Sequence, residues 1–362
     1  MRTNSTERLW DRLAAKGLVI GENPPRADQH SPWFVRVMLG FAGWLGAFFL
    51  LGFVGVSLQF IIESNTASLF TGAAACAAAA FIFNISRGKD FAVQFGLAVS
   101  LAGQALFIWG LWKIFRESAG VRYLAIAVFE ALLVAFIINT IHRVASTLAA
   151  AVSFSFALSL FHTPHLAPAL ITAGFAVVWL NEQGWSARGS LARPVGYGLV
   201  LAAMCINGTL LIGDWPLWLG HRVNNNSGFV MFSYWAGILL NSAVFLFVVS
   251  RLFGREGIRF DSRLAQVALV AALAITLSSF KAPGIIAGLV IVLLGYANGN
   301  RVLTGLGIFA LIAYLSHYYY QLETTLLIKS AVLVATGMVL LVARFVLSRV
   351  LPDKAEEGGN HA

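Results

Sequence analysis

One acidic residue, Glu130, lies within an apolar segment, where a carboxyl group could take part in proton transfer. Glu130 is the only polar residue in the segment 125–134. A carboxyl group within a membrane is a functional-site hypothesis by default, because an unpaired charge there is costly. Burial favours the neutral form of such a group, which suits proton coupling. The alternative is a neutral or hydrogen-bonded acid that only fixes helix packing.

A second set of ionisable residues is expected near one membrane face. These four residues, close to the ends of apolar segments, are Lys281, His317, Glu323 and Lys329. Long basic side chains near span ends usually extend their ammonium groups to the lipid headgroups, which is the ordinary interpretation of the two lysines. The four residues are nevertheless the only cluster on that side that an intramembrane enzyme could use.

The sequence gives no sign of a metal centre or a cofactor site. His162 and His165 have no carboxylate or cysteine neighbours, and Cys76 and Cys205 stand far apart within apolar segments. Metal sites and disulfide frameworks need clustered ligands at short spacing. Phosphate-binding loops, zinc-protease motifs, nucleophile elbows and dinucleotide fingerprints are all missing. We therefore expect no cofactor and no metal, and we assign no catalytic residue.

The composition indicates which solvent surrounds these residues. Of the 362 residues, 59% are apolar and 11% are charged, against roughly 45–50% and about 25% in soluble domains. A soluble fold of this size could not bury so much apolar surface, whereas a bilayer accommodates it. The net charge of +9 comes from scattered basic residues, which does not fit a nucleic-acid-binding surface.

The apolar segments predict an all-α, polytopic transmembrane bundle of about 12 spans. A span needs about 20 apolar residues to cross the hydrocarbon. Pro164 separates two short candidates, because proline interrupts helical hydrogen bonding. The expected spans are 37–62, 67–84, 91–111, 122–141, 147–162, 166–181, 195–213, 229–250, 265–280, 284–299, 302–320 and 325–348.

Lysine and arginine positions predict the orientation. Cytoplasmic loops are enriched in these residues. With the N-terminus inside, 19 of the 25 fall in inside segments and the other six fall outside. This distribution favours an even number of spans with both termini in the cytoplasm. The loop that holds Lys113, Arg116 and Arg122 is the main exception.

The chain divides into three parts. We expect a cytoplasmic N-terminal segment at 1–36, a transmembrane domain at 37–348 and a disordered cytoplasmic tail at 349–362. Residues 5–18 carry an apolar stripe flanked by basic residues, which predicts a short amphipathic helix. That helix either lies on the membrane surface or packs on the cytoplasmic loops. Small residues at 72–80 indicate interior helices or a dimer contact, so an oligomer is one expectation.

The chain also resembles a family of uncharacterised bacterial inner-membrane proteins, known as a domain of unknown function. The resemblance rests on Trp33-Phe34-Val35-Arg36, Phe280-Lys281-Ala282-Pro283-Gly284, Gly295-Tyr296-Ala297-Asn298-Gly299-Asn300-Arg301, Tyr318-Tyr319-Tyr320 and Leu326-Leu327-Ile328-Lys329-Ser330. It implies a multi-pass protein of the bacterial inner membrane, often encoded beside a related membrane protein and a small protein named for a Gly-Asp-Tyr motif. The family has no established activity, so no catalytic residue is carried over.

Two classes of function remain open. The leading hypothesis is a permease-like protein or a component of a membrane complex with an envelope partner. Transport predicts that Glu130 lines a protein cavity with a basic or polar partner, whereas a scaffold predicts a dry, packed bundle. The rival is an intramembrane enzyme, such as a transferase acting on a lipid-linked substrate.

Overall fold

The computed structural model describes most of the central part of the chain. The continuous segments are 63–85, 90–182, 184–185, 189–212, 228–259, 261–278 and 283–321, with residues 13–17 and isolated positions in 38–56 and 327–341. The candidate spans 37–62 and 325–348 therefore lie outside the described segments, except for isolated positions. Of the amphipathic helix expected at 5–18, only 13–17 are described, and residues 13–15 are helical.

Long α-helices form the described part of the chain, which confirms the all-α prediction. Seven of them are long and apolar enough to cross a membrane: α4, α5, α6, α7, α9, α10 and α13. The shorter helices α8 and α12 have 15 residues each. The bounds are α4 (Asn65–Ile85), α5 (Asp90–Ile114), α6 (Ala119–Phe136), α7 (Thr140–Leu160), α8 (Leu166–Leu180), α9 (Gly189–Ile212), α10 (Gly228–Arg255), α11 (Arg263–Ser278), α12 (Pro283–Ala297) and α13 (Arg301–Gln321).

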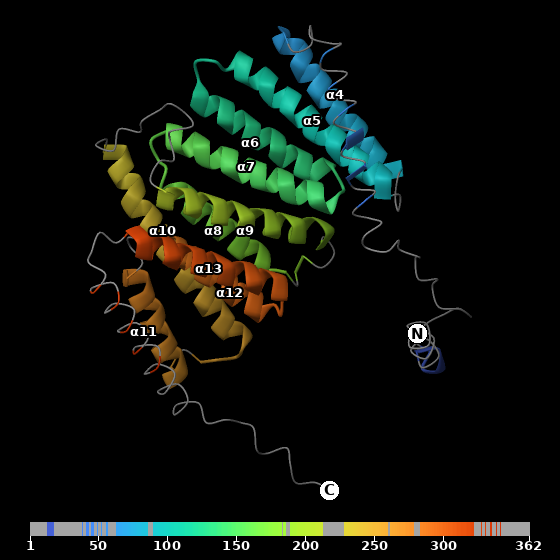
Figure 1. The fold of residues 1–362 in the computed structure, drawn as a ribbon. Coiled ribbons are helices and arrows are strands. Elements are labelled where there is room, and N and C mark those ends of the chain that lie inside the picture. Colours follow the sequence, from blue (N-terminus) through green and yellow to red (C-terminus); the bar gives the residue numbers. More distant parts are fainter. Residues whose placement is uncertain are drawn as a thin grey trace.

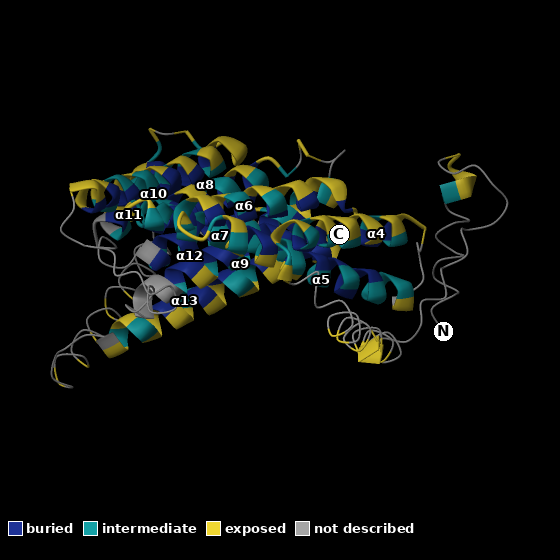
Figure 2. Cartoon of the chain, turned by 90° about the horizontal axis from the view of Figure 1, so that it is seen from above, coloured by how far each residue is buried: buried dark blue, intermediate teal, exposed yellow. Residues whose placement is uncertain are grey.

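Helices α4 to α7 lie side by side in chain order, and α9 rather than α8 is the main neighbour of α7 on the other side (Figure 1). α4 pairs with α5, α6 pairs with α7, and α7 also packs on α9. Beyond α9, α8 packs between α9 and α10, and α12 pairs with α13. Figure 2 shows the buried residues between the helices and the exposed ones on the outer faces. The largest apolar core lies among α7 to α13 and includes Phe175, Trp179 and Leu294.

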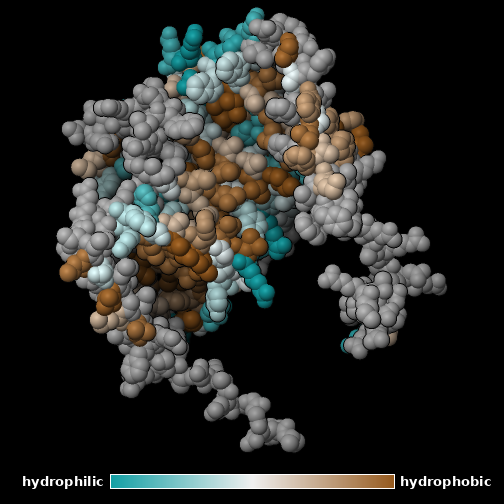
Figure 3. Space-filling model, in the orientation of Figure 1, coloured by the Kyte–Doolittle hydropathy of each residue, from teal (hydrophilic) through white to brown (hydrophobic). Residues whose placement is uncertain are grey.

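The outer faces of the helices are apolar, as a lipid-facing surface requires. Phe70, Phe136, Phe229 and Leu239 are each more than 60% exposed, and Figure 3 shows hydrophobic side chains spread over one face of the bundle. Soluble monomers rarely expose contiguous apolar patches of more than a few hundred Å². The protein is therefore an integral membrane protein.

Hydrogen bonds bring several turns to one end of the bundle. Arg143, at the start of α7, donates to the carbonyl oxygen of Ser190 at the start of α9 over 2.8 Å. Arg255, at the end of α10, donates to the carbonyl oxygen of Leu180 at the end of α8. Asn298, after α12, donates to the carbonyl oxygen of Trp179. The described segments that carry Arg143 and Arg255, both placed inside by the charge rule, thus share one end. Which side of the membrane that end faces stays a prediction.

The turns around α7 differ in part from the expected boundaries. Pro164 does separate two helices, but α7 starts at Thr140 rather than near residue 147. The cause is Asn139, whose side chain accepts a hydrogen bond from the His142 backbone N–H at 3.0 Å and so caps the helix. Arg143, expected in a loop, therefore lies in the first turn of α7 and is buried.

Candidate functional site

Glu130 lies on the face of α6 that points into the protein. It is 0% exposed, and it shares that face with buried Ile126, Leu133 and Val134. Neither carboxyl oxygen has a hydrogen-bond partner among the described residues. A buried polar group without a partner is costly, so this carboxyl group needs a physical explanation.

The side chains that act on Glu130 come from neighbouring helices. The Ser146 hydroxyl on α7 interacts with its carboxyl group, although the geometry falls short of a hydrogen bond. The Cys76 thiol on α4 lies within electrostatic range of the same group. Glu130 therefore has polar neighbours on two other helices.

His142 is the centre of a hydrogen-bonded group next to Glu130. Its ring is fully buried, and its Nε2 lies 2.7 Å from the Ser100 Oγ and 2.9 Å from the Gln104 Nε2. On the other side of the ring, Nδ1 lies 3.4 Å from the Ser146 Oγ. These contacts join α5 to α7 through one imidazole.

The hydrogen-bond roles in this group follow from the donors available. An amide NH2 can only donate, so Nε2 of His142 accepts from Gln104 and Nδ1 of the neutral ring carries the proton. Nδ1 then donates to Ser146, which also accepts from Gln104 at 3.4 Å. The hydroxyl proton of Ser146 is left to point toward the carboxyl group of Glu130. The arrangement is a chain of groups that can exchange protons.

Helical spacing places these residues. Ser100 and Gln104 are four residues apart on α5, and His142 and Ser146 are four residues apart on α7, so each pair shares a face. The Cys76 thiol donates to the carbonyl oxygen of Ser100 at 3.6 Å. We call this group the Glu130–His142 cluster; it comprises Cys76, Ser100, Gln104, Glu130, His142 and Ser146.

Aromatic rings cover the cluster. Phe83 of α4 meets the His142 ring edge-on at 6.2 Å between centroids. Phe107 and Phe129 stack at 3.8 Å across α5 and α6. The six residues of the cluster are each at most 6% exposed, so the cluster faces protein rather than lipid.

The whole of this region belongs to a single family match. A family model described as "Domain of unknown function (DUF4401)" matches residues 32–350. The chain belongs to this family. All helices from α4 to α13, and the complete Glu130–His142 cluster, lie inside the matched DUF4401 region. No curated protein and no solved structure matches the chain.

The four residues predicted near the other face of this DUF4401 chain are only partly placed. His317 lies in α13 and is half-buried. Lys281, Glu323 and Lys329 lie outside the described residues, so their convergence stays a prediction. Within the described residues no group of three or more His, Cys, Asp or Glu side chains could hold a metal ion.

The sequence pattern located Glu130 but did not point to its partners. His142, Ser100 and Ser146 were not singled out, because a helix expected to begin at 147 leaves His142 near a loop. The signal that could have found them is Asn139, a favourable N-cap residue. A helix that begins after Asn139 places His142 and Ser146 on one face. Gln104 is buried as well.

Proposed function

We propose that this protein is permease-like and that the Glu130–His142 cluster takes up and passes a proton within the membrane. The observation that carries the proposal is the fully buried carboxyl group of Glu130, which has no hydrogen bond to a described residue. Ser146 relates it to a histidine that is bonded on both ring nitrogens. If only packing were needed, an apolar side chain would fill this place without the cost of burying an acid.

The proton steps balance within the cluster. A hydronium ion that reaches Ser100 gives a proton to its hydroxyl oxygen as the Ser100 hydroxyl proton moves to Nε2 of His142, which lies 2.7 Å away. His142 then releases the proton on Nδ1 to the Ser146 hydroxyl oxygen. Ser146 passes its own hydroxyl proton to the carboxylate of Glu130, which becomes neutral. Each step breaks one N–H or O–H bond and forms another, and the reverse sequence returns the proton.

The alternatives receive less support from the described residues. A scaffold protein needs only an apolar interior at this place. Instead, four helices each contribute a polar group to the cluster. An enzyme would need several ionisable groups near one face. Of the residues suggested for that role, His317 is the one that the structure describes.

Proton flux into sealed vesicles tests the proposal. The purified protein is reconstituted into liposomes that contain a pH-sensitive dye, and a potassium diffusion potential drives protons inward. We expect Glu130→Gln to slow the initial acidification at least about tenfold, as loss of a general acid–base group does. Glu130→Asp should retain part of the flux. The matched control is Glu256→Gln, because Glu256 is exposed at the end of α10.

Two results would reject the proposal. One is a Glu130→Gln protein that remains folded, by its melting temperature and gel-filtration profile, and conducts protons like Glu256→Gln. The other is wild-type protein that acidifies vesicles no faster than protein-free liposomes.

We also propose a location and a partner class. The charge distribution supports an orientation with both termini in the cytoplasm. The family resemblance implies a bacterial inner-membrane location and an envelope or membrane protein encoded nearby as the partner. The orientation can be tested with a reporter that is active only outside the cytoplasm, fused to the C-terminus. Activity of this fusion would contradict a cytoplasmic C-terminus. Affinity capture of the tagged chain from detergent extracts should recover the neighbouring gene product.

A further inference from the structure

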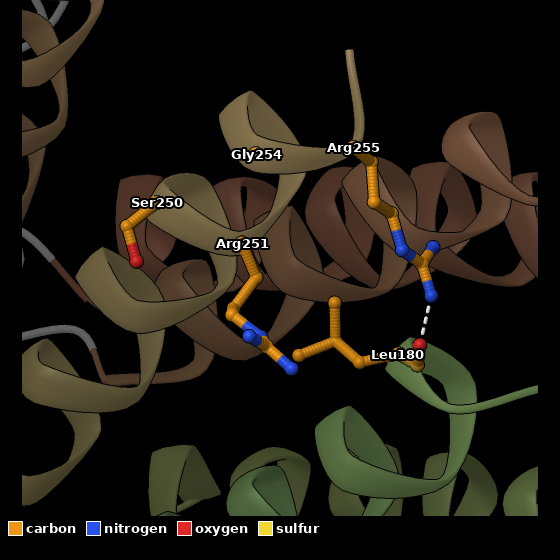
Figure 4. A pocket seen from close by; sticks show the side chains of 5 residues that line it. All are labelled: Leu180, Ser250, Arg251, Gly254 and Arg255. Atoms are coloured by element: carbon orange, nitrogen blue, oxygen red, sulfur yellow. Dashed lines mark hydrogen bonds between the residues drawn. The ribbon is translucent and has the colours of Figure 1, made fainter. Parts of the chain in front are cut away.

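A cavity separate from the Glu130–His142 cluster opens at the basic end of the bundle. Its volume is about 510 Å³, and it lies where the end of α10 passes the end of α8 (Figure 4). The lining residues are Leu180, Ser250, Arg251, Gly254 and Arg255. The described lining thus contains two guanidinium groups and no carboxylate.

The two arginines have different roles in this cavity. Arg255 is anchored, because it donates to the carbonyl oxygen of Leu180 and, over 3.2 Å, to the Oδ1 of Asn298. Both of these acceptors are uncharged, so the charge of Arg255 is not neutralised. Arg251 is exposed and lies 5.8 Å from the centroid of the Phe247 ring. It makes no ion pair with a described residue.

The nearby carboxylates do not supply the missing negative charge. Glu182 pairs with Arg193 at 2.9 Å, and Asp261 pairs with Arg259 at 3.1 Å. Glu256 follows Arg255 but is exposed and does not line the cavity. Arg251 and Arg255 therefore face the same space one helical turn apart, where like charges repel.

We propose that this cavity binds a phosphate-bearing anion, with Arg251 as its principal ligand and Arg255 as the fixed second cation. Guanidinium groups bind phosphate oxygens through paired N–H donors. Figure 4 shows Arg251 and Arg255 extending from α10 toward the end of α8, where Leu180 forms an apolar wall. An anion between the two guanidinium groups removes their repulsion.

Two sources present this chemistry at the end of a membrane bundle. One is the headgroup of an anionic phospholipid, which basic pockets between transmembrane helices bind; the half-exposed Phe247 ring would then contact acyl chains. The other is a soluble phosphate. The two sources are separated by testing each one alone.

Gly254 offers a way to block the cavity without breaking the fold. A Cβ atom built on Gly254 meets no atom of the described residues within 4 Å, so the space beside it is open on their side. Leucine also favours the helix more than glycine does. Gly254→Leu should therefore fill the cavity and leave the helix intact.

Binding to the purified full-length protein in detergent tests the proposal. The probes are short-chain phosphatidylglycerol, short-chain phosphatidylcholine and inorganic phosphate, measured by titration calorimetry. We expect wild-type protein to bind phosphatidylglycerol or phosphate with saturation and phosphatidylcholine more weakly. Arg251→Gln should weaken that binding about tenfold or more, the usual effect of losing a charge-assisted hydrogen bond. Gly254→Leu should weaken it by a similar factor, because the leucine side chain fills the space that the anion needs.

The matched control is Arg116→Gln, which removes one exposed charge in the turn between α5 and α6, away from the cavity. Binding of phosphatidylglycerol but not phosphate identifies a lipid headgroup as the ligand, and competition by phosphate identifies a soluble phosphate. The proposal is overturned if the wild type binds neither anion, or if Arg251→Gln and Gly254→Leu bind as tightly as Arg116→Gln.

Discussion

The His142 ring on α7 and the Ser100 hydroxyl on α5 lie 2.7 Å apart, and both side chains are fully buried. α5 packs mainly on α4, whereas α7 packs on α6 and α9. The contact therefore links the α4–α5 pair to the rest of the bundle. Protonation of His142 would turn Nε2 from an acceptor into a donor. The Ser100 hydroxyl could then accept instead of donating, whereas the Gln104 amide could no longer donate to the ring.

The first prediction concerns the energy of this link. His142→Leu leaves the Ser100 hydroxyl and the Gln104 amide without their partner and should lower the melting temperature in detergent. Such interhelical hydrogen bonds contribute about 0.6–2 kcal/mol. In a double-mutant cycle, the effects of His142→Leu and Ser100→Ala on the free energy of unfolding should differ from additivity by a similar amount.

Ser155 provides the control for that cycle. It is buried on the same helix, but its hydroxyl donates to the carbonyl oxygen of Ala151 in the preceding turn. His142→Leu and Ser155→Ala should therefore be additive. Additivity between His142 and Ser100 would show that their contact has no energetic effect.

The second prediction concerns Arg143 as a link between helix ends. Its Nε donates to the carbonyl oxygen of Val134 at 3.1 Å, and its Nη1 donates to that of Ser190 at 2.8 Å. An ammonium group cannot reproduce this forked geometry. Arg143→Lys should lower the free energy of unfolding by about 1–3 kcal/mol, because one buried carbonyl oxygen loses its hydrogen-bond donor. Arg116 is exposed, so Arg116→Lys should leave the melting temperature unchanged. Equal changes in melting temperature for the two variants would show that Arg143 does not link the helix ends.

The sequence predicted a membrane environment, the all-helical class and most helix positions, because the length of the apolar segments alone determines them. It also placed Glu130 within an apolar helical segment, which the structure has as α6. It could not place helix ends that depend on a single cap, as at Asn139, and it therefore missed His142. Arg122, counted as an outside-loop charge, lies instead in α6, buried over the Trp112 ring at 4.0 Å. Which residues meet across helices depends on rotation about each helix axis, and these helices are apolar around most of their circumference.

The third prediction concerns acid sensitivity at the turn before α8. Burial lowers the pKa of His165 from its ordinary value of 6.5, and its ring meets Tyr234 edge-on at 5.2 Å. Below the ordinary pKa the unfolded chain binds a proton that the folded chain does not. The free energy of unfolding therefore falls as pH falls, down to the folded pKa.

Melting temperatures from about pH 8 to about pH 5 measure this effect around the ordinary histidine pKa. Wild-type protein should lose more stability over this range than His165→Asn, which has no titrating ring. Above the ordinary pKa the pH dependence of the two proteins should be the same. Parallel curves across the whole range would show that His165 does not titrate differently on unfolding.

The last prediction concerns the close approach of α7 and α9, which positions the start of α7 and hence His142. A Cβ atom on Gly198 would lie 2.5 Å from the Thr147 Cβ and 2.8 Å from the Val144 carbonyl oxygen. Because one of these atoms is backbone, the helices would have to separate, at a cost of about 1–3 kcal/mol. Gly208 lies on the same helix, and no atom of the described residues lies within 4 Å of its Cβ position. Gly208→Ala should be neutral or stabilising by up to about 1 kcal/mol, whereas Gly198→Ala should lower the melting temperature and slow proton flux. If Gly198→Ala melts like Gly208→Ala, the two helices do not pack as closely as the structure has them.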